Sequence, residues 1–173
     1  MWLEYAEDDA LIWVAVFFLL LAVTDFFDGY LARKFDVVSD LGKLLDPLVD
    51  KLLILIPLIH LVGMRSSVTG DPWVPAWMVS LVLARELFIT GLRGIAASRG
   101  RVLPAGDLGK IKTCFQVLAV FFLILHRNKL FMMNDEWMDG YYLGLQFLMA
   151  SIFIGYWSAV EYIYAVAKSA DRQ

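Results

Sequence analysis

The sequence predicts an all-α membrane protein, a single domain covering residues 1–173 and built as a bundle of about five transmembrane helices. Hydrophobic residues make up 60% of the 173 residues, and aromatic residues make up 14%. A helix that crosses a bilayer needs roughly 20 apolar residues, so a chain of this length holds about five or six of them with short connections. Helices are favoured over strands because an isolated strand in lipid leaves its backbone groups without hydrogen-bond partners.

Five apolar segments predict the individual helices in chain order. Each segment is bounded by clusters that contain Gly, Pro, Asn, Asp or Ser, the residues that most often interrupt helices or form turns. The predicted spans are residues 10–30, 45–63, 74–97, 110–126 and 140–166.

The basic residues predict how these helices are oriented. With five spans, alternate ends fall on alternate sides of the membrane, and loops rich in Lys and Arg normally stay in the cytoplasm. One side, or the helices that open on it, holds twelve basic residues, whereas the other holds three, Arg65, Arg127 and Lys129. The twelve are Arg33, Lys34, Lys43, Lys51, Arg85, Arg93, Arg99, Arg101, Lys110, Lys112, Lys168 and Arg172. The N-terminus is therefore predicted outside and the C-terminus in the cytoplasm.

Four aspartates lie at the predicted cytoplasmic ends of the first two spans. Asp25 and Asp28 are three residues apart, and Asp46 and Asp50 are four apart, so each pair shares one face of its helix. Carboxylates at this depth repel one another unless protons or cations neutralise them. Their hard oxygen atoms favour Mg²⁺, Mn²⁺ or Ca²⁺, and the sequence has no cluster of His or Cys for a softer ion.

An alternative for Asp46 is a helix cap. Asp46 precedes Pro47, and an N-cap aspartate followed by proline at the first helical position is a common start of a helix. A cap does not explain Asp25, Asp28 and Asp50, and the whole set favours a metal site.

The same stretch carries a longer pattern, D-x2-D-G-x2-A-R-x8-G-x3-D-x3-D. Its fixed positions are Asp25, Asp28, Gly29, Ala32, Arg33, Gly42, Asp46 and Asp50. The pattern resembles the signature of the CDP-alcohol phosphotransferase family. The resemblance implies two Mg²⁺ or Mn²⁺ ions, held by Asp25, Asp28, Asp46 and Asp50. It also implies that Asp50 is the general base, and that the CDP-lipid contacts Gly29, Ala32, Arg33 and Gly42.

The glycines and the arginine of this pattern also have physical roles. Gly29 lets a phosphate approach the helix backbone closely, and Gly42 can adopt loop conformations closed to other residues. Arg33 offers a planar fork of donors for phosphate oxygens. From position alone, an anchor that reaches to the lipid headgroups is an equally good interpretation of Arg33, and the resemblance favours the substrate.

A second block narrows the resemblance. "LARELFITGLRGIAASRG" and "LPAGDLGKIKTCFQ" look like the phosphatidylglycerophosphate synthase branch, which has an A-R-E helix, a later L-R and a G-K-x-K-T segment. The branch implies phospholipid biosynthesis in the bacterial cytoplasmic membrane. A phosphatidyl group passes from CDP-diacylglycerol to sn-glycerol 3-phosphate, and CMP is released on the cytoplasmic side. The implied partners are these substrates, membrane lipids and a second copy in a homodimer, and no nucleic acid is expected.

Four basic residues predict a site for the acceptor's phosphate. Arg85 lies about 12 residues from the cytoplasmic end of its span, on the order of 18 Å into the membrane, where an arginine has to line a cavity or meet an anion. Arg93 lies two turns nearer the cytoplasm, and Lys110 and Lys112 begin the next span. Alternatively, Arg85 pairs with a carboxylate of another helix, such as Glu86 of a partner chain, and the lysines only anchor the topology.

Other interpretations stay open. The pattern also fits CDP-alcohol phosphotransferases of the cardiolipin, inositol-phosphate or serine type. A divalent-cation channel or transporter would place carboxylates in the membrane too, although the acids here cluster at one end of the spans. The family usually has six spanning helices, and the match of the aspartate pattern to the first span predicts that the family's first helix is absent from this chain.

Overall fold

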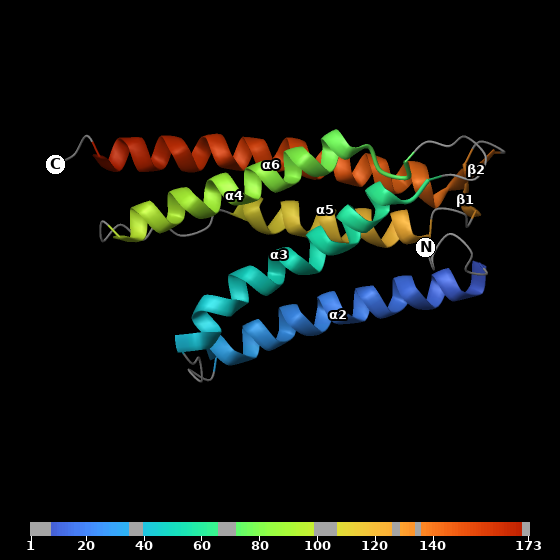
Figure 1. The fold of residues 1–173 in the computed structure, drawn as a ribbon, viewed down its shortest axis with the longest axis horizontal. Helices are drawn as coiled ribbons and strands as arrows, with labels where there is room; N and C mark the ends of the chain where they lie inside the picture. The colour runs from blue at the N-terminus through green and yellow to red at the C-terminus, as the bar shows by residue number, and fades with distance from the viewer. Residues whose placement is uncertain are drawn as a thin grey trace.

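The described residues of the chain include five helices, which pack into a bundle (Figure 1). This computed structural model describes residues 8–34, 40–65, 72–98, 107–125, 129–133 and 136–170. The helices are α2 (Asp8–Lys34), α3 (Asp40–Gly63), α4 (Ala76–Ser98), α5 (Asp107–Ile124) and α6 (Gly140–Ala170). Each of the five predicted spans falls on one of these helices, so their order is confirmed within the described part of the chain.

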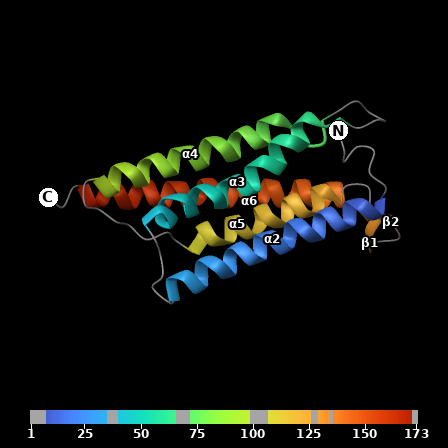
Figure 2. The same ribbon diagram turned by 60° about the horizontal axis from the view of Figure 1, so that its bottom comes forward.

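Consecutive helices run in opposite directions along the bundle (Figures 1 and 2). As a result, α2, α4 and α6 end where α3 and α5 begin, at the left-hand end of both views. We call this the motif end, because the aspartate pattern falls on the parts of α2 and α3 that lead to it. The alternation that the charge count assumed is therefore present in the fold.

The start of α3 corrects two predictions. The helix begins at Asp40, five residues before the predicted span, and an aspartate is among the residues preferred at a helix start. Asp46 therefore lies inside the helix, and its interpretation as an N-cap is wrong. Gly42 also lies in the helix, so a loop conformation there is wrong as well. Pro47 is accommodated in the second turn, although it has no backbone N–H to donate.

A β-hairpin between α5 and α6 was not predicted. Strand β1 (Lys129–Met133) pairs antiparallel with β2 (Glu136–Asp139), with Met133 opposite Glu136. The sequence analysis expected only a connection here. The segment is rich in large apolar residues, some of which favour strands. When its two halves pair, their backbone N–H and C=O groups also bond each other, which they would not do in an open loop.

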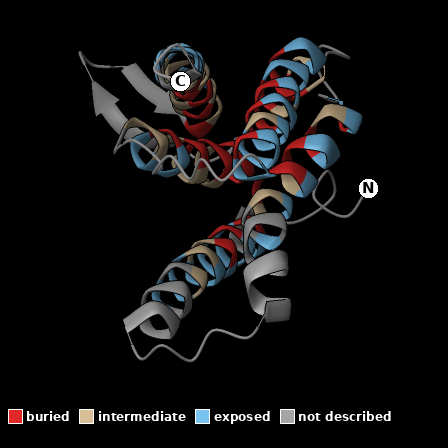
Figure 3. Ribbon diagram, turned by 90° about the vertical axis from the view of Figure 1, so that its left-hand side faces the viewer, coloured by how far each residue is buried: buried red, intermediate tan, exposed pale blue. Residues whose placement is uncertain are grey.

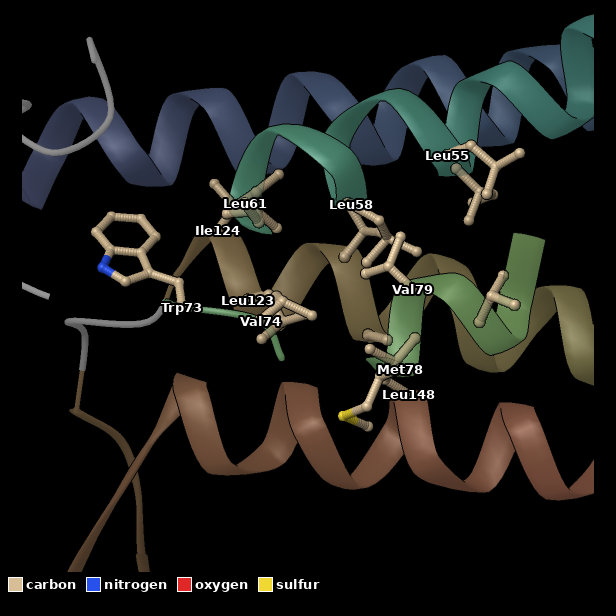
Figure 4. Packing of buried hydrophobic residues seen from close by; sticks show 14 of the residues in the cluster. Leu55, Leu58, Leu61, Trp73, Val74, Met78, Val79, Leu123, Ile124 and Leu148 are labelled. Atoms are coloured by element: carbon tan, nitrogen blue, oxygen red, sulfur yellow. The ribbon is translucent and has the colours of Figure 1, made fainter. Parts of the chain in front are cut away.

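The core of the bundle lies where α3, α4, α5 and α6 meet (Figure 4). Leu58 and Leu61 of α3 face Leu123 of α5, with Val79 of α4 and Leu148 of α6 closing the cluster. Leu58, Leu61, Leu123 and Leu148 are at most 1% exposed. Contacts among these buried side chains hold α4 and α5 against α6.

The helices also have exposed outward faces (Figure 3), and these carry large apolar side chains. Trp13, Phe153 and Trp157 are 74%, 72% and 67% exposed. Among the described residues, one helix, Gly140–Lys168, is long and apolar enough to cross a membrane by length and composition, and shorter apolar helices cover Ala10–Asp25 and Lys51–Gly63. The first of these shorter stretches ends at Asp25, and the second begins directly after Asp50. Both apolar stretches therefore stop at charged residues of the aspartate motif.

The α5–α6 contact depends on two glycines in a G-x-x-x-G run at the start of α6. A Cβ added to Gly140 would lie 2.6 Å from the carbonyl oxygen of Leu125. A Cβ added to Gly144 would lie 2.6 Å from Leu123 Cγ and 2.8 Å from Leu123 N. Small residues of this spacing let two helix backbones approach closely.

We expect Gly144→Ala to destabilise the protein, because the new methyl group collides with backbone as well as side-chain atoms of Leu123. Overpacking of this kind costs about 1–3 kcal/mol. Thermal unfolding of the purified protein in detergent measures the effect. Gly94→Ala is the matched control, since a Cβ at Gly94 meets nothing within 4 Å. Equal melting temperatures for the two variants would contradict the close α5–α6 contact.

Candidate active site

The aspartate motif lies on α2 and α3. Asp25 and Asp28 belong to α2, and Asp46 and Asp50 belong to α3, so each pair falls on one face of a continuous helix. The side chain of Asp25 is half-buried. The side-chain positions of the other motif residues lie outside what the structure describes: Asp28, Gly29, Ala32, Arg33, Gly42, Asp46 and Asp50.

The donor set of the motif fits the chemistry of a hard divalent ion. Four carboxylates supply only oxygen ligands, the type that Mg²⁺ and Mn²⁺ prefer. Among the side chains that the structure describes, no group of three or more His, Cys, Asp or Glu residues is placed to hold a metal ion. Three of the four predicted ligands fall outside that set, and the metal site stays a prediction.

Three charged side chains form a buried cluster where α4, α5 and α6 meet. Glu86 Oε1 accepts hydrogen bonds from Arg85 Nη1, at 3.0 Å, and from Lys112 Nζ. Arg85 Nε donates to the carbonyl oxygen of Gly155 at 3.1 Å. Arg85, Glu86 and Lys112 are 8%, 8% and 5% exposed. One carboxylate thus serves two cations, and the cluster keeps a net positive charge away from solvent.

This cluster refines the two interpretations of Arg85. Arg85 does pair with a carboxylate, but that carboxylate is Glu86 of its own chain, the next residue of α4. Lys112 is buried, so it is more than a topology anchor at the surface. Sequence reasoning named Glu86 only as a residue of a partner chain, because neighbouring residues of one helix point about 100° apart and rarely meet. The available signal was its place in the A-R-E run, beside an arginine too deep to stay unpaired.

A cavity of about 10 Å³ adjoins the cluster, bordered also by Gln116 of α5 and Ser151 of α6. This is roughly the space that one water molecule needs. Gln116 and Ser151 are buried as well, and Ser151 Oγ donates to the Leu148 carbonyl at 2.7 Å. A phosphate therefore does not fit between the charges as they stand, and the cations have to move from Glu86 to meet one.

The other two predicted acceptor contacts lie nearer the motif end. Arg93 is exposed two turns along α4 from Arg85, and its Cζ atom lies 5.5 Å from the ring centroid of Tyr162 on α6. Lys110 is exposed near the start of α5. The structure thus brings Arg85 and Lys112 together and places Arg93 and Lys110 outside their cluster, towards the motif end.

The helices of the cation cluster pack against a helix of the aspartate motif. Arg85 and Glu86 lie on α4 and Lys112 on α5, and both helices contact α3, which carries Asp46 and Asp50.

An apolar groove of about 390 Å³ runs between α2 and α3. Its lining includes Leu21, one turn before Asp25, and Val49, the residue before Asp50. From there the groove continues away from the motif end as far as His60. Apart from this histidine, its lining is apolar.

A family model described as CDP-alcohol phosphatidyltransferase matches residues 1–163 of this chain. The match covers most of the 173 residues, so the protein belongs to the CDP-alcohol phosphatidyltransferase family. The resemblance carried by the aspartate pattern is thereby confirmed.

The names of individual relatives specify a particular reaction, whereas the family model does not. The CDP-diacylglycerol–glycerol-3-phosphate 3-phosphatidyltransferase of Bacillus subtilis is 46% identical over 112 residues, which are 65% of this chain and 54% of the relative. The protein of the same name from Rickettsia bellii is 41% identical over 111 residues, 64% of this chain and 58% of the relative. A cardiolipin synthase (CMP-forming) from Oryza sativa is 34% identical over 153 residues, 84% of this chain and 46% of the relative. The chain thus spans about half the length of these relatives.

We expect Glu86→Gln to lower the stability of the protein strongly. The variant leaves Arg85 and Lys112 buried beside a neutral amide, and removing one partner of a buried ion pair costs about 3–5 kcal/mol. Thermal unfolding in detergent measures the loss. Glu161→Gln is the control, because Glu161 is exposed and accepts its hydrogen bond from Trp157 at the surface of α6. Similar melting temperatures for both variants would contradict the cluster.

Proposed function

We propose that the protein transfers the phosphatidyl group of CDP-diacylglycerol to sn-glycerol 3-phosphate and releases CMP, as an enzyme of phospholipid biosynthesis. The observation that carries the proposal is the buried Arg85–Glu86–Lys112 cluster, because its net positive charge lies on helices that pack against α3, which carries part of the family's aspartate motif. A phosphorylated acceptor needs cations at this position, next to the donor. The names of the bacterial relatives support the same reaction.

In this proposal the bundle spans the bacterial cytoplasmic membrane, with the motif end in the cytoplasm. The length and apolarity of α6, the exposed apolar side chains and the twelve-to-three distribution of basic residues support it. Two copies associate as a homodimer, as the family resemblance implies. Lipid or the second copy then covers the outward apolar faces.

The donor lipid lies against α2 and α3. Asp25, Asp28, Asp46 and Asp50 would hold two Mg²⁺ or Mn²⁺ ions, which would supply positive charge to the pyrophosphate of CDP-diacylglycerol. Gly29, Ala32, Arg33 and Gly42 contact the CDP-lipid. The groove between α2 and α3 takes an acyl chain of the donor, because it begins beside the motif and continues into the apolar part of the bundle.

The chemical step is attack of the glycerol hydroxyl on the phosphorus atom attached to diacylglycerol. Asp50 accepts the hydroxyl proton as the new P–O bond forms. The bond between this phosphorus and the oxygen of the CMP phosphate breaks, and CMP leaves with its electron pair. CMP then departs into the cytoplasm at the motif end. The chain contributes mainly position and fixed charge.

The acceptor's phosphate is bound by Arg85, Arg93, Lys110 and Lys112. Arg93 and Lys110 are exposed towards the motif end and meet the incoming anion first. Arg85 and Lys112 then turn from Glu86 towards the phosphate, since the cavity beside them holds no more than about one water. Glu86 is their counter-ion while the site is empty.

A cardiolipin-synthase-type reaction is the second candidate, because the Oryza sativa relative of that name aligns with 84% of the chain. The two candidates share the donor site and differ in the acceptor. An acceptor screen therefore separates them.

Release of CMP tests the reaction and its base. The protein in mixed micelles with CDP-diacylglycerol and Mg²⁺ should release CMP when sn-glycerol 3-phosphate is added, and far less with glycerol, inositol or serine. Asp50→Asn should lower the rate by about 10²–10⁴-fold, because an amide cannot accept the proton. Asp40→Asn, at the start of the same helix and outside the motif, should keep the wild-type rate. Residual activity of Asp50→Asn above about a tenth of wild type would contradict Asp50 as the base.

If Arg85 and Lys112 bind the acceptor's phosphate, their variants should change KM for sn-glycerol 3-phosphate more than KM for CDP-diacylglycerol. Arg85→Gln and Lys112→Gln should raise KM for sn-glycerol 3-phosphate roughly tenfold or more, since a charge-assisted contact to phosphate is worth about 1.5–3 kcal/mol. KM for CDP-diacylglycerol should change less, and Arg33→Gln should show the opposite bias. Arg65→Gln removes a cation at the other end of α3 and serves as control. Equal changes in both constants for Arg85→Gln and Lys112→Gln would overturn the assignment.

A further inference from the structure

One face of the last helix touches three of the four cations assigned to the acceptor. Ser151, Gly155 and Tyr162 are four and seven residues apart on α6, so they lie on the same side of the helix. Gly155 accepts a hydrogen bond from Arg85 and packs against Lys112. The ring of Tyr162 lies against the guanidinium of Arg93.

We infer that Gly155 and Tyr162 are positioning residues of the acceptor site, which hold Arg85, Lys112 and Arg93 in the places from which these cations reach a phosphate. The inference rests on the proposed function. Neither residue belongs to the aspartate motif or to the basic residues assigned to the phosphate. Both act through the cations that they touch.

Gly155 suits this role because it has a carbonyl group and no side chain. A Cβ at this position would lie 3.2 Å from Lys112 Cδ, 3.4 Å from Lys112 Cγ and 3.6 Å from Arg85 Nε. The stem of Lys112 is buried, so an added methyl group has to push it by a few tenths of an ångström. The Gly155 carbonyl also fixes Nε of Arg85, while Nη1 bonds Glu86. With Nε held by this carbonyl, Nη1 of the planar guanidinium can leave Glu86 and turn to an anion while the rest of the side chain keeps its place.

Tyr162 suits the role because it restrains an exposed cation. Arg93 has a long side chain with many rotamers, and ordering such a chain on binding costs free energy. The face of an aromatic ring attracts a guanidinium at this distance. Arg93 is thus held along α6 before the acceptor arrives.

A purely structural role of this face makes a different prediction. If Gly155 and Tyr162 only pack α6 against α4, their variants should lower the melting temperature and affect both substrates alike. If they position the cations, KM for the acceptor should change selectively. Alanine is also favoured over glycine inside a helix, so Gly155→Ala can disturb the site without weakening the helix.

The first test is Gly155→Ala in the CMP-release assay. We expect KM for sn-glycerol 3-phosphate to rise about three- to tenfold, because small misplacements of binding groups have large effects on catalysis. KM for CDP-diacylglycerol and the melting temperature should stay near wild type. Gly91→Ala is the matched control, since a Cβ at Gly91 of α4 meets nothing within 4 Å.

The second test concerns Tyr162. Tyr162→Leu should raise KM for sn-glycerol 3-phosphate about two- to fivefold, and Tyr162→Phe, which keeps the ring, should restore most of it. In an Arg93→Gln background, Tyr162→Leu should have no further effect. Tyr164→Leu is the control, because Tyr164 is exposed two residues further along α6, on another side of the helix.

The outcomes separate this inference from the proposed function. Suppose that the wild-type protein uses sn-glycerol 3-phosphate. If Gly155→Ala and Tyr162→Leu leave KM for this acceptor unchanged, or raise KM for both substrates equally, the positioning role alone is overturned. A wild-type protein that releases no CMP with this acceptor would overturn both.

Discussion

A single buried carboxylate organises the cationic half of the site. Arg85 comes from α4 and Lys112 from α5, and two like charges held this close without solvent would repel each other. Glu86 stands between them, and Arg85 extends the network to the backbone of α6. Such a cluster is expensive to desolvate, and apolar side chains would fill the same space at less cost in free energy. A buried cluster of this kind is thus weak evidence for a stabilising role, and the anion binding proposed above would account for its place in the core.

The helices were predictable because apolar runs of membrane length are strong signals in a single sequence. The errors lie where this signal ends. The first turns of α3 from Asp40 are polar enough to read as a loop, and the hairpin of Lys129–Met133 and Glu136–Asp139 depends on pairing between two short strands. The N-cap interpretation of Asp46 failed for the same reason, since it placed the helix start by the local residues alone.

Of the predicted site residues, the structure brings Arg85 and Lys112 together at Glu86, and the roles assigned to the whole set stay predictions. The depth of Arg85 correctly indicated a buried partner, because an unpaired cation is too costly there. The sequence did not reveal that this partner is Glu86 or that Arg85 also bonds Gly155, seventy positions away. Contacts over such separations depend on how the helices pack. The packing of α3 against α4 and α5, which relates the motif to the cations, is of the same kind.

Because of the glycine run at the start of α6, the α5–α6 pair is more rigid than the rest of the bundle. With Leu123 almost touching the backbone of Gly144, α5 and α6 cannot slide past each other without a steric clash, so they form a rigid frame. By contrast, α2 borders the apolar groove along part of its contact with α3 and has fewer tight restraints there. The helices that carry the carboxylates, α2 and α3, are therefore the part of the bundle that deforms most easily. Changes in the separation between carboxylates and cations come mainly from movement of these two helices, while the α5–α6 frame fixes the backbone positions of Lys110 and Lys112.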